Sequence, residues 1–145
     1  MKNSLSKNIE TVLKANYLGE NTWLRNEDFA SSIWGRLPRA ALSASVQSIE
    51  NAMGFVRDKL EREGYLMIAN VEVDKRKING RKLARPEDLD YIISEIQRRA
   101  KRRNGITAPL ARAVENVNKG GLLPPGSPPV DQLMDGKQVI SGLLA

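Results

Sequence analysis

The feature that most constrains the fold is a series of three amphipathic segments followed by a stretch of β-forming residues. Apolar side chains recur at helical spacing over residues 4–18, 26–34 and 46–60. Residues 65–73 are then rich in the β-branched, aromatic and aliphatic types that favour strands. This order predicts a mainly helical α+β domain, in which three helices precede a small sheet.

Polar and glycine residues between these segments predict where each helix begins and ends. Gly19 is expected to end the first helix, and Asn26 to cap the second. Residues 36–45 are interpreted as a connection, and a short helical turn beginning at Pro38 within it is left open; Ser45 is the expected cap of the third helix. Gly64 is expected to end that helix in a left-handed conformation. Four residues of the second helix are expected to be buried: Phe29, Ala30, Ile33 and Trp34.

The pair Asn79-Gly80 is a strong signal for a tight turn, and it predicts a β-hairpin with strands at 66–78 and 81–84. Pro86 is well placed to begin a fourth helix. An apolar face on that helix would pack on the domain or form a homodimer: Leu89, Ile92, Ile93 and Ile96. The sequence thus divides into a domain at 1–85, a helical extension at 86–118 and a tail at 119–145, whose Pro-Pro pairs predict a flexible segment.

The absence of histidine and cysteine narrows the possible chemistry. The chain has no His and no Cys, which excludes disulfides, Cys-ligated zinc and a Ser-His-Asp triad. We therefore expect no enzyme, no metal and no cofactor. No apolar run approaches the roughly 20 residues that span a bilayer, and the first residues do not resemble a signal peptide. The expected location is cytoplasmic, with no membrane partner.

Positive charge is concentrated in two places. The formal net charge is +6 and the pI is about 9.8. Residues 74–85 and 97–103 each carry +5, so the rest of the chain carries −4. A concentrated positive charge predicts a polyanionic partner, and nucleic acid fits best.

The sequence VRDKLEREGYL at 56–66 resembles the join between recognition helix and first wing strand in winged helix-turn-helix proteins. The segments 27–35 and 46–61 are also similar to DNA-binding domains of two-component response regulators. The resemblance covers about the first 85 residues. This chain departs from that family because it shows no receiver domain and no final Gly-Tyr strand, and it continues into a basic helix.

The resemblance implies a protein that binds double-stranded DNA, with the third helix in the major groove. Gln47, Ser48 and Asn51 are the preferred base-contacting residues, and Arg57 is a further candidate. The expected wing contacts to phosphate or the minor groove are Lys75, Arg76, Lys77, Arg81 and Lys82. A basic helix would add phosphate contacts, or face an acidic protein, through Arg98, Arg99, Lys101, Arg102 and Arg103.

Several functions remain open at this point. The first hypothesis is a small transcriptional regulator of the kind found in bacteria, phages and plasmids, binding its operator as a dimer. The second is a replication or recombination adaptor whose tail docks on a protein. A third is a protein-binding inhibitor. A metal-dependent nuclease is the remote alternative, using Glu72, Asp74, Lys75, Glu87 and Asp88. Trp23 and Trp34 are interpreted as core residues.

Overall fold

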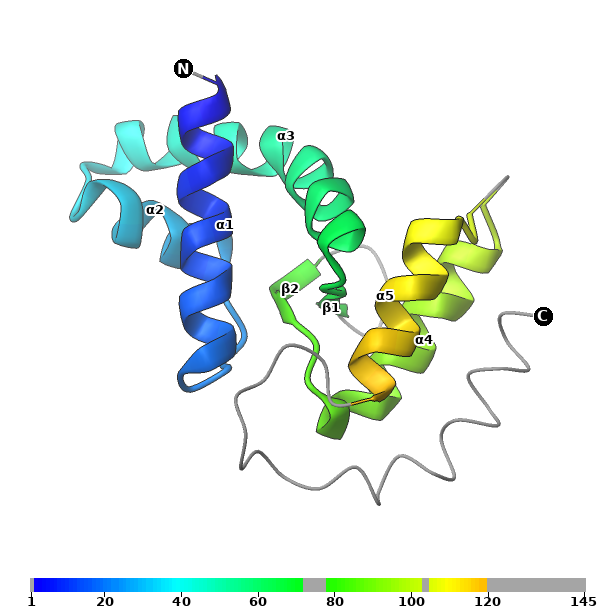
Figure 1. Cartoon of the computed structure of the whole chain (residues 1–145). Coiled ribbons are helices and arrows are strands. Elements are labelled where there is room, and N and C mark those ends of the chain that lie inside the picture. The colour runs from blue at the N-terminus through cyan, green and yellow to red at the C-terminus, as the bar shows by residue number, and fades with distance from the viewer. Residues whose placement is uncertain (1, 72–77, 103–104, 120–145) are drawn as a thin grey trace. The chain divides into compact units, whose positions relative to one another are not determined.

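The computed structural model describes residues 2–71, 78–102 and 105–119 (Figure 1). Along the chain it has α1 (Lys2–Leu18), α2 (Asn26–Trp34), α3 (Arg39–Glu63), β1 (Met67–Val71), β2 (Ile78–Leu83), a 3-10 turn (Pro86–Asp88), α4 (Leu89–Ala100) and α5 (Ala108–Asn118). The strands pair as a two-stranded antiparallel sheet. The predicted α+β class is confirmed. The predicted tail lies outside the described residues, apart from Lys119.

The chain forms two compact units. The first contains residues 1–59 and 69–82, and the second contains residues 60–68 and 83–145. The division therefore falls inside α3 and inside both strands, whereas the sequence suggested a division near residue 85. Each unit is described separately below.

The core of the first unit comes from α1, α2 and α3, and α1 packs against α2 (Figure 1). Its buried apolar side chains are Ile9, Leu13, Tyr17, Phe29, Ala30, Ile49, Met53 and Val56. They follow the predicted helical spacing, since one face of each helix must leave water. Two residues of α2 that were predicted to be buried are not: Ile33 is half-buried, and Trp34 is 44% exposed. Helix α2 ends at Trp34 and buries only Phe29 and Ala30.

The start of α2 differs from the prediction. Arg25 is the capping residue, and Asn26 is already helical. The Asp28 carboxylate accepts a hydrogen bond from the Arg25 backbone N–H at 2.8 Å. Helix α2 ends at Trp34, and the next residue, Gly35, has a φ of 77°. Because Asp28 serves the helix end, the Asn26 amide remains available for partners elsewhere.

Helix α3 begins at Arg39, so the predicted connection at 36–45 and the predicted cap at Ser45 are wrong. The Leu42 backbone N–H donates to the Pro38 carbonyl at 2.9 Å and opens the helix there. The residues that follow, AALSA at 40–44, are mostly strong helix formers. Residues 40–44 lack the apolar stripe by which a sequence pattern predicts a helix, so the pattern indicates a connection there.

The end of α3 is as predicted. Gly64 has a φ of 99°, its N–H donates to the Glu61 carbonyl, and the Tyr65 N–H donates to the Leu60 carbonyl. This pair of hydrogen bonds is the Schellman arrangement, which requires a left-handed residue and so favours glycine. The Asn116 side chain also donates to the Gly64 carbonyl at 3.0 Å.

The hairpin turn was predicted at the wrong residues. Residues 72–77, which connect the strands, lie outside the described part, while Asn79 and Gly80 lie within β2. Leu24 and Arg81 form an antiparallel bridge through two backbone hydrogen bonds of 2.9 and 2.8 Å. A Cβ on Gly80 would lie 2.9 Å from the Trp23 Cβ. The glycine therefore allows β2 to approach Trp23 and Leu24, in the segment before α2, closely.

The second unit has its own apolar core, drawn from the end of α3, the neighbouring strand residues, α4 and α5. Its buried side chains include Leu60, Leu66, Ile68, Leu83, Ile92, Ile96, Leu110, Ala113, Val114 and Val117. Ile92 and Ile96 are at most 1% exposed, whereas Leu89 and Ile93 are half-buried. Packing within one chain therefore accounts for much of the face that suggested a dimer. Helix α5 follows in this unit, and Thr107 caps it.

No helix in the described ranges combines the length and the apolar character that a membrane crossing requires.

Candidate nucleic-acid interface

The first ten residues of α3, Arg39–Ser48, form a helical segment with no buried side chain. Ile49 is the first residue of the helix to enter the core. Most helices in proteins are held by packing of an apolar face. This segment instead presents small and polar side chains to its surroundings, and it therefore offers a surface for a partner.

The same part of the chain contains no acidic residue. From Phe29 to Ile49 the only charged side chains are Arg36 and Arg39, and both are exposed. The helix dipole adds partial positive charge at the start of α3. These two arginines lie outside both basic segments that the sequence shows. They stand out only because residues 29–49 contain no acidic residue.

Three residues predicted to contact bases lie at the end of this segment or just beyond it. Gln47 and Ser48 belong to the segment, Asn51 follows in the next turn, and all three are exposed. The Gln47 amide donates to the Asn51 side-chain oxygen at 3.0 Å, so the structure brings these two together. Arg57 lies further along the helix, is half-buried and pairs with Asp58 at 3.2 Å. It is therefore separate from the other three.

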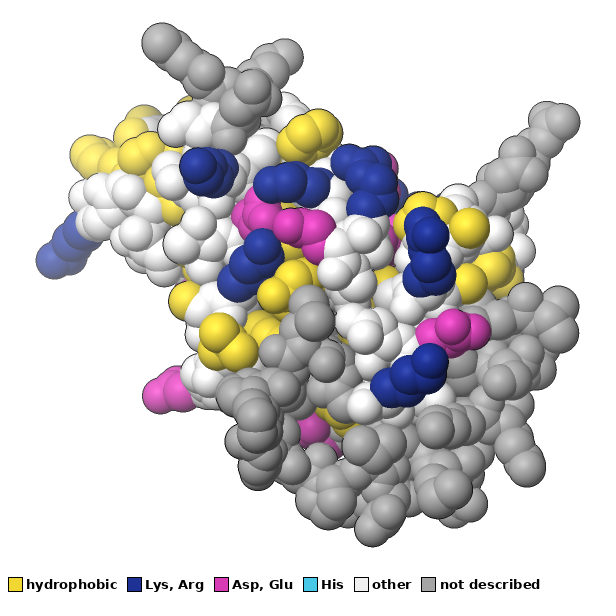
Figure 2. Space-filling model, viewed as in Figure 1, with side chains coloured by type: hydrophobic (Ala, Val, Ile, Leu, Met, Phe, Trp, Pro, Cys, Tyr) yellow, Lys and Arg dark blue, Asp and Glu magenta, His cyan; other side chains and the backbone are white. Residues whose placement is uncertain are grey.

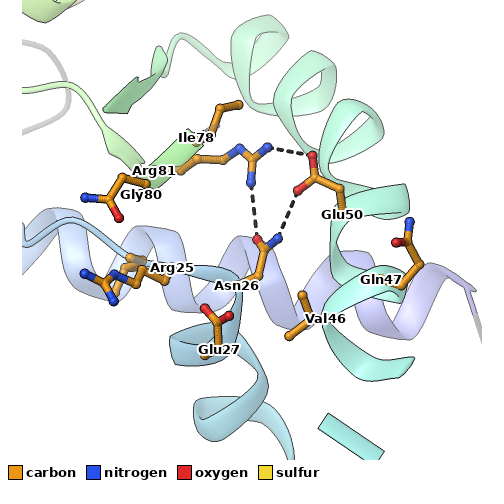
Figure 3. A pocket seen from close by; sticks show the side chains of 11 residues that line it. Arg25, Asn26, Glu27, Val46, Gln47, Glu50, Ile78, Gly80 and Arg81 are labelled. Atoms are coloured by element: carbon orange, nitrogen blue, oxygen red, sulfur yellow. Dashed lines mark hydrogen bonds and ion pairs between the residues drawn. The ribbon is translucent and has the colours of Figure 1, made fainter. Parts of the chain in front are cut away.

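A cleft of about 450 Å³ lies beside these residues, between the start of α2, α3 and β2 (Figure 3). Three polar side chains meet in it. The Arg81 guanidinium donates to a Glu50 oxygen at 2.9 Å and to the Asn26 side-chain oxygen at 3.2 Å. The Asn26 amide donates to the second Glu50 oxygen at 3.0 Å. This Asn26–Glu50–Arg81 network ties residues that are 24 to 55 positions apart.

Electrostatics keep Glu50 charged. The hydrogen bond from Arg81 lowers the pKa of Glu50, and although partial burial raises it, the Asn26 hydrogen bond and the Arg81 charge lower it further. The pKa therefore lies below its ordinary value of 4.5. Glu50 is a carboxylate at neutral pH, and its negative charge is offset by Arg81.

The predicted wing residues separate into two groups. Lys75, Arg76 and Lys77 lie outside the described residues. Arg81 and Lys82 are buried, with 9% and 7% of their surface exposed. The Lys82 ammonium lies 4.7 Å from the centre of the Trp23 ring and donates to the Asn21 carbonyl. Both side chains are thus occupied within the first unit, which favours a structural role for them over phosphate contact.

The predicted basic helix is similarly divided. Arg99 is 6% exposed and binds Glu61, while Arg98 pairs with Glu95. Lys101 and Arg102 are exposed, and Arg103 lies outside the described residues. On the side of the molecule drawn in Figure 2, Lys and Arg side chains lie at separate positions, with acidic side chains among them.

The acidic residues considered for a nuclease do not form a site in the described part of the chain. Glu72, Asp74 and Lys75 lie outside it, and Glu87 and Asp88 belong to the 3-10 turn before α4. Among the described residues, no three His, Cys, Asp or Glu side chains are grouped to hold a metal ion. Comparisons with protein-family models, curated proteins and solved structures found no significant match.

Proposed function

We propose that this protein binds double-stranded DNA through a winged helix-turn-helix arrangement in its first unit, with α3 in the major groove. The observation that carries the proposal is the exposed, acid-free first part of α3, together with the hydrogen bond that joins exposed Gln47 to exposed Asn51 in the next turn. Glutamine and asparagine can each form paired hydrogen bonds with adenine. The order of three helices and a hairpin also fits the proposed arrangement.

The dimensions of α3 support this proposal. The major groove is about 12 Å wide, and a helix with side chains is about 10–12 Å across. Ala40, Ser43 and Ala44 are small and exposed, so they permit close approach. Arg36 and Arg39 supply charge for phosphates at the start of the helix. By sequence, the connection between β1 and β2 adds Lys75, Arg76 and Lys77, which we assign to phosphate contact.

A titration of duplex DNA at two salt concentrations tests the proposal. We expect binding that weakens steeply with salt, and a log–log salt slope that falls by about one for each phosphate contact removed. Arg36→Ala/Arg39→Ala and Lys75→Ala/Arg76→Ala/Lys77→Ala should both reduce the slope. Arg62→Ala/Arg112→Ala is the matched control, since it removes two exposed charges from the second unit. No affinity at low salt would exclude the proposal.

Selection from random duplexes then separates a regulator from an adaptor. A transcriptional regulator should prefer its site over random DNA by about 10³-fold or more. The adaptor would show little preference and would require residues 120–145 for its protein partner. Our proposal is the regulator, because the exposed amides of Gln47 and Asn51 can each form paired hydrogen bonds with a base.

Gly54 offers a further test, because no contact among the described residues requires a glycine there. It lies exposed within α3, and an added Cβ would meet no atom within 4 Å. A glycine inside a helix costs about 1 kcal/mol relative to alanine. Gly54→Ala is therefore expected to stabilise the fold by about that amount. If the DNA backbone approaches the helix there, the same variant should bind DNA more weakly.

Thermal unfolding and DNA affinity, measured on the same Gly54→Ala sample, would check this pair of opposite effects. A variant that gains stability and keeps full DNA affinity would show that the DNA does not approach α3 at this position.

A further inference from the structure

Glu50 is an acidic residue in an unexpected place. It is the first carboxylate after the acid-free segment, and it lies next to Asn51 on α3. Its side chain is 46% exposed, whereas that of its partner Arg81 is 10% exposed. The carboxylate therefore faces the cleft in Figure 3, and the arginine supports it from inside the unit.

The network holds Glu50 in one orientation and leaves it able to accept more hydrogen bonds. Arg81 occupies one carboxylate oxygen and Asn26 the other. A carboxylate has about four acceptor positions, so each oxygen keeps capacity for a further donor. Gln47 and Asn79 line the same cleft, and their side chains are also polar. The site is thus suited to a ligand that presents an N–H donor.

The negative charge of Glu50 must be offset if this residue is to lie beside DNA. An isolated carboxylate near phosphates would repel them, but Arg81 offsets the charge of Glu50 at 2.9 Å. The ionised Glu50 carboxylate, whose charge Arg81 offsets, can therefore lie at the DNA surface in a fixed orientation. In the major groove, the amino group of cytosine is the donor that glutamate accepts from.

We infer that Glu50 determines part of the DNA sequence preference by accepting a hydrogen bond from the amino group of a cytosine. Asn26 and Arg81 act as positioning residues that orient its carboxylate. This inference rests on the proposed DNA-binding function. It also gives buried Arg81 a role in recognition that differs from the phosphate contact expected from its sequence.

The test combines a protein change with a change in the base. A site is first selected from random duplexes with the intact protein. Each cytosine in that site is then replaced by pyrimidin-2-one, which lacks the amino group. At one position we expect the replacement to weaken binding of the intact protein about tenfold. With Glu50→Ala, the same replacement should have an effect of less than about twofold, since no side-chain oxygen remains at this position to accept from the amino group.

Selection with the Glu50→Gln protein gives a second measurement. Glutamine pairs with adenine, so preference at that position should move from cytosine to adenine. Glu20→Gln is the matched control, because it removes one exposed negative charge from the same unit and should leave the selected site unchanged. Arg81→Lys should reduce the amino-group effect at the same position and at no other.

The outcomes distinguish failure of the Glu50 inference from failure of the proposed DNA binding on which it rests. An amino-group effect that is equal in the intact protein and in Glu50→Ala would overturn the inference, while DNA binding itself would stand. A selected site without a sensitive cytosine would do the same. Absence of DNA binding by the intact protein would overturn both. The base replacement is made with the unaltered protein, so the first measurement does not depend on the folding of any variant.

Discussion

Replacing Glu61 with alanine is expected to lower the free energy of unfolding by about 3–5 kcal/mol, the range found when one partner of a buried ion pair is removed. The Arg99 guanidinium donates to the two Glu61 oxygens at 2.6 and 3.1 Å. The side chains are only 7% and 3% exposed. Without Glu61, Arg99 loses two short hydrogen bonds to a buried negative charge, and Glu95 is farther from it, at 3.7 Å.

Urea unfolding of Glu61→Ala and two companion variants would measure this effect. Glu115→Ala is the control, since Glu115 is exposed on α5. In Glu61→Leu/Arg99→Met both charges are replaced by apolar groups, and the stability should return to within about 1 kcal/mol of the original, or exceed it. A loss below about 1 kcal/mol for Glu61→Ala would contradict burial of the pair.

Replacing Phe29 with alanine is expected to cost about 3–5 kcal/mol, whereas replacing Trp34 should cost no more than about 1 kcal/mol. Phe29 is fully buried in the first unit, and removal of its ring leaves a cavity as well as losing apolar contact. Trp34 lies five residues later on the same helix and is 44% exposed. The two variants thus compare aromatic residues that the sequence pattern predicts to be equally buried.

Equilibrium unfolding in urea, followed by circular dichroism, would give both values. Equal losses of unfolding free energy in the two variants would mean that Trp34 is buried, which would contradict its exposure in the structure. A small loss for Phe29→Ala would place the core of the first unit elsewhere.

Features that depend on neighbours in sequence were predictable. The spacing of Ile9, Leu13 and Tyr17 predicted a buried helix face, because the helical period alone decides which side chains share a side. Gly64 predicted a helix end, since its left-handed backbone is a local requirement. In the candidate site, exposure of Gln47, Ser48 and Asn51 followed from the apolar stripe on the opposite side of α3. That these residues contact bases stays a prediction.

Features that depend on distant partners were not predictable. Asn79 and Gly80 resemble a turn locally, but the approach of Trp23 places Gly80 within a strand. A basic side chain is expected in water unless a partner offsets the cost of burial. The sequence alone therefore determined the helix faces, the ends of several helices and the excess of positive charge. Only the tertiary structure decided which charges are buried, because Asn26 and Glu50, which bind Arg81, and Glu61, which binds Arg99, lie 31 to 55 residues away along the chain.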